Sequence, residues 1–210
     1  MEQRDLAALT VKRLKEKYPD AECTLDYAQP WHLLVAAILS AQCTDARVNL
    51  ITPAVFARYS DLASLAVAEL TELEDLIRSC GLYRTKARNI LASAQMLIND
   101  FNGDLPQSTE DLIRLPGVGR KIANLILGDC YGIPAIVVDT HCARISRLIG
   151  LTDSTDPLTV ERDLVQVLPA QDWIAYGHLM VNHGREICIA RRPDCQNCPL
   201  NDICRSSLAR

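Results

Sequence analysis

A lysine follows a glycine-containing turn in the stretch LPGVGRKIA, residues 115–123. Lys121 comes directly after Arg120 at the start of a segment with helical periodicity, where the helix dipole and the neighbouring cation both disfavour the ammonium form. A neutral lysine amine is a nucleophile that can form a Schiff base with a sugar aldehyde or its equivalent. The alternative is that Lys121 only binds phosphate, and the lysine by itself does not separate these two roles.

Residues 108–131 around this lysine read as helix, tight turn, helix. Ser108 is a candidate N-cap and Pro116 ends the first helix. Gly117 and Gly119 would let the backbone adopt conformations closed to other residues and bring its N–H groups close to an external group. The start of a helix favours a phosphate there, so the turn can hold a nucleic-acid backbone without reading bases. A helix–helix turn without a ligand explains the glycines equally well.

A carboxylate stands 18 residues after the lysine, in the stretch IVVDTHCARISRLIG. Asp139 ends an apolar run and precedes a helical segment, so capping preference predicts an N-cap. A rigidly capped carboxylate can also assist deprotonation of Lys121 or stabilise a cationic sugar. His141 is close enough in sequence to orient Asp139. His178 and His183 lack the spacing of metal ligands on a helix and are interpreted as structural.

Four of the nine cysteines fall near the end of the chain with the spacing C-x6-C-x2-C-x5-C. Four thiolates suit either a structural zinc or a [4Fe-4S] cluster, and the single C-x2-C pair favours the cluster. Arginines surround these cysteines and would present charge to a phosphate backbone. The five remaining cysteines lie among apolar neighbours and are interpreted as small buried hydrophobes. The four candidate ligands are Cys188, Cys195, Cys198 and Cys204.

The composition is that of a globular protein, with 49% hydrophobic and 23% charged residues among 210. The formal net charge of -4 argues against nucleic-acid binding, but the charge is uneven. Residues 153–172 are acidic, whereas arginines and Lys121 gather around the motifs above, so a local basic face is possible. The first residues lack the apolar region of a secretory signal, and no apolar run is long enough to span a membrane. An intracellular protein is expected.

Periodicity is helical almost everywhere and predicts an all-α protein of roughly ten helices. Thr71 and Gly81 are predicted to bound one helix, and Asp156 followed by Pro157 to begin another. The run AIVVD, residues 135–139, has strand character but no partner strand. Gly-Ile-Pro at 132–134 marks the best break between a helical middle and a C-terminal part.

Taken together, these motifs resemble the endonuclease III family of DNA glycosylases, in the helix-hairpin-helix glycosylase superfamily. The resemblance runs from LSAQCTDARVN (39–49) through GLYRTKARNI (81–90), LPGVGRKIA and VDTHCARISRL to the cysteine tail. It implies two helical lobes with a central cleft that binds DNA, a helix-hairpin-helix motif and a C-terminal iron-sulfur cluster loop. Residues 22–133 would form a six-helix domain with the hairpin at about 108–131. Residues 1–21 plus 134–210 would form the cluster domain.

The same resemblance implies a bifunctional DNA N-glycosylase and abasic-site lyase of base excision repair. Lys121 would attack the sugar of a flipped-out oxidised pyrimidine, release the base and cut the strand by β-elimination, with Asp139 as its catalytic partner. Gln42 and Leu82 match positions that fill the gap left by the flipped nucleotide, as a polar plug and an apolar wedge. The alternative for Gln42 is a polar residue at a solvated helix end, and the alternative for Leu82 is an ordinary core leucine. The further expected DNA contacts are Gly117, Val118, Gly119, Arg120, His141, Arg144 and Arg192.

The expected cofactor is a [4Fe-4S] cluster, and the expected partner is double-stranded DNA with damaged pyrimidines or abasic sites. We expect a monomer without membrane association, cytoplasmic and nucleoid-associated, from a prokaryote. Cys142 and Ala143 replace bulkier residues of the family, and Gly177 stands where a histidine is frequent. Three rivals remain: a monofunctional glycosylase, which lacks a lysine at this position; a non-catalytic or redox-sensing iron-sulfur protein; and a zinc-stabilised module.

Overall fold

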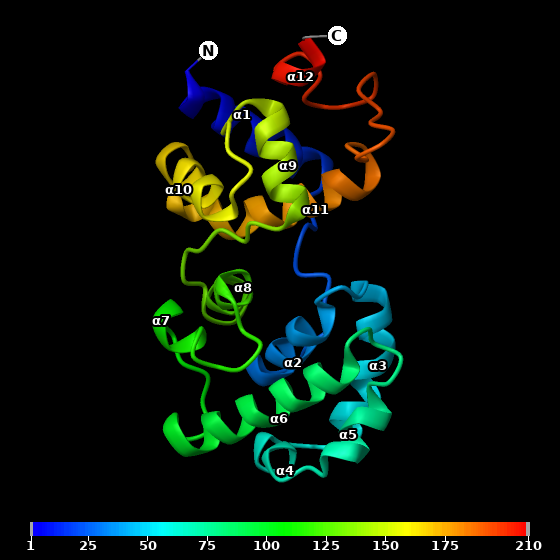
Figure 1. Cartoon of the computed structure of the whole chain (residues 1–210). Coiled ribbons are helices and arrows are strands. Elements are labelled where there is room, and N and C mark those ends of the chain that lie inside the picture. Colours follow the sequence, from blue (N-terminus) through cyan, green and yellow to red (C-terminus); the bar gives the residue numbers. More distant parts are fainter. Residues whose placement is uncertain (1, 209–210) are drawn as a thin grey trace. The chain divides into compact units, whose positions relative to one another are not determined.

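A computed structural model of the chain describes residues 2–208, and within this range the regular structure is entirely helical (Figure 1). The chain divides into two compact units. The middle unit is Thr24–Tyr131, and the second unit joins the residues up to Cys23 to those from Gly132 onward. The prediction of an all-α protein is therefore confirmed. No helix between residues 2 and 208 combines the length and apolarity required to cross a bilayer.

The middle unit is built around α2 (Pro30–Ser40), whose sequence PWHLLVAAILS is apolar on every side. Because a helix without a polar face must be enclosed, α2 packs against α3, α6 and α8. Pro30 occupies the first turn, where its missing N–H costs nothing. The other helices of this unit are α3 (Asp45–Arg58), α4 (Leu62–Ala66), α5 (Leu70–Leu76), α6 (Tyr83–Asp100), α7 (Thr109–Leu112) and α8 (Arg120–Tyr131).

Helix α5 differs from its prediction at both ends. The N-cap position is Glu69, without a side-chain cap bond, so the assignment of Thr71 as the cap is wrong. After Leu76 the chain tightens to bonds three residues apart: the Arg78 N–H bonds the Asp75 carbonyl at 3.4 Å, and the Cys80 N–H bonds the Ile77 carbonyl at 2.8 Å. Residues 77–82 form a compact turn into α6 instead of a last helical turn.

The second unit packs α11 (Trp173–Glu186) against α9 (Thr140–Ile149) and α1 (Gln3–Lys17). The run Ala135–Val138 is buried but has no regular secondary structure and pairs with no strand, as its isolation in the sequence predicts. Gly177 of α11 lies against it: a Cβ at this glycine would stand 3.3 Å from Val137. A glycine here therefore allows the close approach of α11 to this run. The remaining helices are α10 (Pro157–Val167), the 3-10 helix η1 (Ala170–Asp172) and α12 (Arg205–Leu208).

Two of the helix caps predicted from the sequence, those of α7 and α10, are confirmed as follows. The Ser108 hydroxyl accepts the Asp111 N–H at 3.2 Å and begins α7. The Asp156 carboxylate accepts the Thr159 N–H at 2.9 Å, and Pro157 is the first residue of α10. These bonds satisfy donors that a helix leaves without intrahelical partners.

Candidate active site

The hairpin turn joins α7 to α8 and depends on Gly117. This glycine has φ of +84°, in the left-handed region, and a Cβ there would stand 2.8 Å from the Asn89 side-chain amide. The neighbouring Pro116 carbonyl accepts the Ser93 hydroxyl at 2.8 Å. The Ser93–Pro116 bond fastens the turn to α6, whereas the positive φ and the closeness of Asn89 disfavour a larger residue at position 117.

Gly119 differs from Gly117, because its φ is not positive and a Cβ there would meet no atom within 4 Å. The prediction that both glycines adopt conformations closed to other residues is therefore wrong for Gly119. Its lack of a side chain leaves open space in front of the first turn of α8. Val118, between them, is buried, and its N–H bonds the Leu115 carbonyl at 3.0 Å within the turn.

Lys121 is the second residue of α8, and its side chain is exposed. Arg120 beside it is also exposed. The first turn of a helix carries unpaired N–H donors and partial positive charge, so this end of α8 attracts phosphate. The structure thus places an accessible amine directly beside a surface suited to a nucleic-acid backbone.

Gln42 and Leu82 occupy two exposed turns of the same unit, and both have left-handed backbones, with φ of 54° and 61°. Leu82 is 59% exposed at the N-cap position of α6, so its interpretation as a core leucine is wrong. A Cβ at Gly81 would stand 3.6 Å from the Gln42 carbonyl oxygen, which shows that the two turns touch. Residues other than glycine whose backbone is held in the left-handed region are typical of functional positions.

Asp139 belongs to the second unit and is the N-cap of α9, as its sequence predicts. Its carboxylate accepts the Cys142 N–H at 2.7 Å and is partly exposed. Cys142 is fully buried beneath it, and burial raises the pKa of its thiol far above the usual range. A Cβ at Gly184 of α11 would overlap Nδ1 of His141. His141 is therefore positioned against α11 on the same turn as Asp139.

Arg144 and Arg192, which are expected DNA contacts, and Arg205, which is one of the arginines around the cysteines, have different surroundings. Arg144 of α9 donates to the Cys188 carbonyl at 2.7 Å and to the Cys188 sulfur at 3.5 Å. Arg205 donates to Asp153 at 2.8 Å and to the Arg147 carbonyl at 2.9 Å. Arg192 is exposed on the loop between Cys188 and Cys195. Two of the arginines near the cysteines thus hold α9 to the C-terminal segment.

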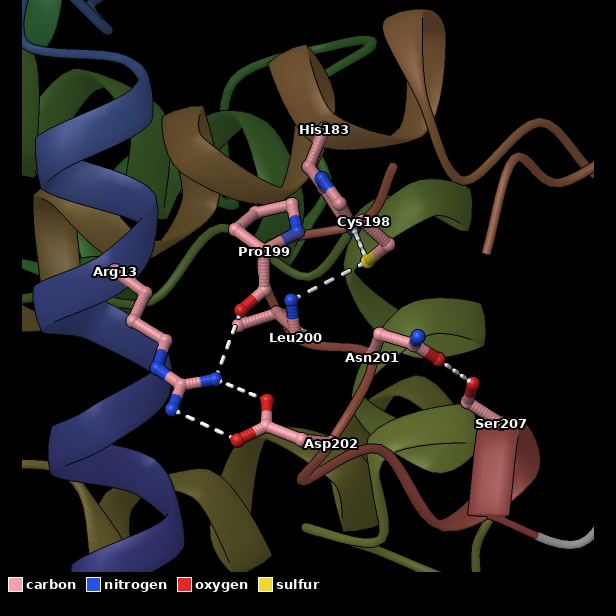
Figure 2. Close-up of polar contacts among 8 residues, drawn as sticks. All are labelled: Arg13, His183, Cys198, Pro199, Leu200, Asn201, Asp202 and Ser207. Atoms are coloured by element: carbon pink, nitrogen blue, oxygen red, sulfur yellow. Dashed lines mark hydrogen bonds and ion pairs between the residues drawn. The ribbon is translucent and has the colours of Figure 1, made fainter. Parts of the chain in front are cut away.

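The cysteine segment is fastened to α1 and α11 (Figure 2). Arg13 of α1 donates to the Pro199 carbonyl at 2.9 Å and forms a two-bond ion pair with Asp202. The Cys198 sulfur accepts the Leu200 N–H at 3.4 Å and lies 3.6 Å from Nε2 of His183. His183 is buried, and burial lowers its pKa to about 4, so the imidazole is neutral near pH 7. Its structural interpretation fits this packing.

The four candidate ligand thiols are free cysteines that lie close enough to influence one another electrostatically. Burial raises the pKa of the Cys198 thiol to about 11, and the charges of the other three cysteines act in the same direction. A cationic iron-sulfur core offsets that mutual repulsion of thiolates. Across residues 2–208, no three His, Cys, Asp or Glu side chains gather around one point tightly enough for a single metal ion. A [4Fe-4S] core instead offers a separate iron to each of four thiolates.

Several neighbours of these sites carry no signal in the sequence. Lys86 of α6 is buried and donates to the Leu39 carbonyl at 2.8 Å, which ties α6 to the end of α2. Among the five cysteines interpreted as buried, Cys80 and Cys142 are buried, whereas Cys23, Cys43 and Cys130 are partly exposed. These contacts depend on long-range packing that no local motif records.

Comparison with known proteins agrees with this arrangement. Residues 35–170 match the model of the "HhH-GPD superfamily base excision DNA repair protein", and residues 188–204 match the "Iron-sulfur binding domain of endonuclease III". Endonuclease III of Synechocystis sp. is 48% identical, covering 93% of this chain and 90% of the relative. Endonuclease III of Bacillus subtilis is 41% identical, covering 94% and 91%. The iron-sulfur match supports the [4Fe-4S] cluster as the cofactor.

Solved structures agree as well. The "Structure of a Trapped Endonuclease III-DNA Covalent Intermediate: Estranged-Adenine Complex" has a TM-score of 0.93 and 41% identity, covering 100% of this chain and 99% of that one. A thermostable thymine-DNA glycosylase, at 19% identity and a TM-score of 0.86, shares the fold over 98% of both chains. The chain belongs to the endonuclease III family, within the HhH-GPD superfamily of base excision DNA repair proteins.

Proposed function

We propose that Lys121 and Asp139 carry the chemistry of this enzyme, a DNA glycosylase and abasic-site lyase that removes oxidised pyrimidines in base excision repair. The observation that carries the assignment is the exposed Lys121 amine in the first turn of α8, directly after the open backbone at Gly119. A similar solved structure is that of a trapped endonuclease III–DNA covalent intermediate, and a covalent bond to DNA requires a nucleophile on the protein.

The proposed reaction begins at the sugar of a nucleotide turned out of the duplex. The neutral Lys121 amine attacks C1', the C1'–N bond breaks, and the base leaves after gaining a proton. Opening of the sugar ring gives a Schiff base between Nζ and C1'. Removal of a proton from C2' then breaks the C3'–O bond and cuts the strand. Water finally releases the sugar fragment and restores the amine.

The other groups act by position and charge. The Asp139 carboxylate accepts the proton that Lys121 loses and stabilises the positive charge of the sugar. The hairpin residues Gly117, Val118, Gly119 and Arg120 hold a backbone phosphate, mainly through N–H groups and one guanidinium. Gln42 and Leu82 enter the gap left by the extruded nucleotide. Arg192 contacts phosphate, His141 orients Asp139, and Arg144 steadies Cys188.

The cluster held by Cys188, Cys195, Cys198 and Cys204 supplies a cross-link for the C-terminal segment. The partner of the protein is double-stranded DNA that contains a damaged pyrimidine or an abasic site. We also propose that the protein acts as a monomer on nucleoid DNA in the cytoplasm of a prokaryote. Sizing of the protein bound to a short duplex tests this stoichiometry, and two protein chains on one lesion would contradict it.

The decisive experiment is borohydride trapping on a duplex with one thymine glycol. The parent protein is expected to give a covalent protein–DNA band, because borohydride reduces the Schiff base to a stable amine. Lys121→Ala is expected to abolish the band. Lys12→Ala is the matched control, since Lys12 is an exposed lysine on α1. Base release without a band in the parent would indicate a glycosylase that uses water, and a persistent band in Lys121→Ala would exclude Lys121 as the nucleophile.

A further inference from the structure

Two cysteines outside the iron-sulfur segment lie against each other in the middle unit. The sulfurs of Cys43 and Cys80 are 3.9 Å apart, although the residues are separated by 37 positions in the chain. Formation of a disulfide requires these sulfurs to approach by roughly 2 Å. Cys43 is partly exposed and Cys80 is buried, so one thiol of the pair is accessible to a reagent.

The segments that carry the two thiols are already held together. The buried Lys86 amine donates to the Leu39 carbonyl at 2.8 Å and so joins α6 to the end of α2. The Gln42 carbonyl oxygen stands 3.6 Å from the position of a Cβ at Gly81. Because these contacts already hold the two segments together in the reduced protein, formation of a disulfide costs little further chain entropy.

Each thiol is also close in the chain to a residue proposed to fill the gap that the flipped-out nucleotide leaves in the DNA. Gln42 directly precedes Cys43, and Leu82 is two residues after Cys80. Both assigned residues have left-handed backbones, which residues other than glycine rarely adopt, so each conformation depends on the turn that holds it. We propose that Cys43 and Cys80 are a reversible redox pair, oxidised by a low-molecular-weight disulfide, whose bond shifts these two turns and slows DNA cleavage. The effect on cleavage rests on the function proposed above.

The oxidation proceeds by two thiol–disulfide exchanges. The Cys43 thiolate attacks one sulfur of the small disulfide, forms a mixed disulfide and expels one small thiolate. The Cys80 thiolate then attacks the Cys43 sulfur, forms the Cys43–Cys80 bond and expels the second. The two protein thiols lose two electrons and two protons, which end on the two small thiols. Burial raises the pKa of the Cys80 thiol to about 11, which favours Cys43 as the first to react.

The test begins with the cluster-containing protein equilibrated with oxidised and reduced glutathione, while the visible absorption of the cluster is followed. Free thiols are alkylated and tryptic peptides are analysed by mass spectrometry. The expected product joins the peptide of residues 18–47 to the peptide of residues 79–84. Cys43→Ser and Cys80→Ala are expected to abolish it. Cys23→Ser is the matched control, because Cys23 lies in the same tryptic peptide as Cys43 and its loss should leave the link intact.

Cleavage of an abasic duplex is then measured in single turnover. Oxidation is expected to slow the parent roughly tenfold, with recovery after dithiothreitol, because small displacements of positioning groups are costly. Oxidised Cys43→Ser is expected to cleave as fast as when reduced. Absence of the linked peptide while the cluster stays intact overturns the redox pair, and a link without slower cleavage overturns its effect on DNA. Failure of the reduced parent to cleave would instead contradict the proposed function, since the peptide analysis is independent of activity.

Discussion

At the scale of single residues, the two glycines of the hairpin show that the same residue type serves two different needs. Gly117 is required by its backbone, with φ of +84° and Asn89 directly against it. Gly119 has an ordinary φ and open space around it. A glycine that the protein itself does not need is explained by something outside the chain that approaches the backbone.

The two glycines should therefore respond differently to alanine. Gly117→Ala is expected to lower the free energy of unfolding by about 1–2 kcal/mol, because a side chain in the left-handed region is strained. Gly119→Ala is expected to change that free energy by less than about 1 kcal/mol but to weaken binding of an abasic duplex roughly tenfold, through loss of close phosphate contact. Urea unfolding and fluorescence anisotropy measure the two quantities. Parent-like DNA binding by Gly119→Ala would contradict a phosphate site at this turn.

Asp139 combines two roles that substitution can separate, since its carboxylate is both a cap for α9 and the proposed partner of Lys121. Asp139→Ala is expected to lose about 1 kcal/mol of stability with the cap, whereas Asp139→Asn keeps a capping oxygen. Both variants are expected to excise thymine glycol about 10²- to 10⁴-fold more slowly, because both lack the charge. Thermal unfolding and single-turnover excision test this. Parent-like excision by Asp139→Asn would show that the charge is not needed.

At the scale of elements, carboxylate caps fix where helices begin in both units. Asp61 begins α4 and accepts the Ser64 N–H at 2.7 Å, and Asp156 begins α10 in the same manner. Both carboxyl groups have a pKa below their usual range. The largest cause is the hydrogen bond from the backbone N–H of the capped residue, which is Ser64 for Asp61 and Thr159 for Asp156. Such caps stabilise the fold more when they are ionised, because the charge strengthens the hydrogen bond and interacts favourably with the helix dipole.

These caps predict a loss of stability in acid. Because the pKa values of Asp61 and Asp156 are lower in the folded state, their contribution is present above the unfolded pKa of about 3.9 and is lost as the pH falls below it. The difference in melting temperature between pH 7 and pH 3 should therefore be smaller in the double variant Asp61→Asn, Asp156→Asn, whose caps do not titrate. Acid damage to the cluster affects parent and variant alike. An unchanged difference would show that these caps do not contribute to the pH dependence.

The element boundaries also show how far local sequence determines structure. The predicted caps Ser108 and Asp156 are confirmed, because a cap bonds an N–H only a few residues ahead. Helix α5 starts before Thr71 and ends before Gly81, and in the turn that follows it the Cys80 sulfur lies 3.9 Å from that of Cys43 in a distant segment. The sequence therefore predicts these two caps but neither end of α5.

At the scale of the whole molecule, a net charge of -4 must coexist with DNA binding. Residues 153–172 carry five acidic side chains against one arginine, whereas Arg120, Lys121 and Arg192 are exposed near the motifs. Attraction between a few cations and phosphates is local, and it falls steeply as salt competes for the phosphates. Binding should accordingly be modest in affinity and strongly dependent on salt.

The salt dependence can be assigned to individual arginines. Arg192→Gln is expected to reduce the slope of log affinity against log salt by about 1, because one phosphate contact is lost. Arg162→Gln removes an exposed arginine from the acidic segment and is expected to leave the slope unchanged. Fluorescence titration of an abasic duplex from about 50 to 200 mM salt measures both slopes. Equal slopes for Arg192→Gln and the parent would show that Arg192 does not contact a DNA phosphate.

The sequence by itself determines the features that depend on near neighbours. Helical periodicity and capping residues predict the all-α fold, and the spacing from Cys188 to Cys204 predicts the cluster segment. The ordered motifs predict the family, and they place Lys121 after a glycine turn and Asp139 at a helix start. Each of these inferences needs only residues that are close in the chain.

Only the tertiary structure decides which distant residues meet. Arg144 bonds Cys188 across 44 positions, and Cys43 meets Cys80 across 37. Exposure of Leu82 is another such outcome, because a leucine is apolar whether it is buried or not. The physical reason is that burial and long-range contact come from the packing of whole helices, to which every residue of the core contributes, whereas periodicity and capping act within one or two turns.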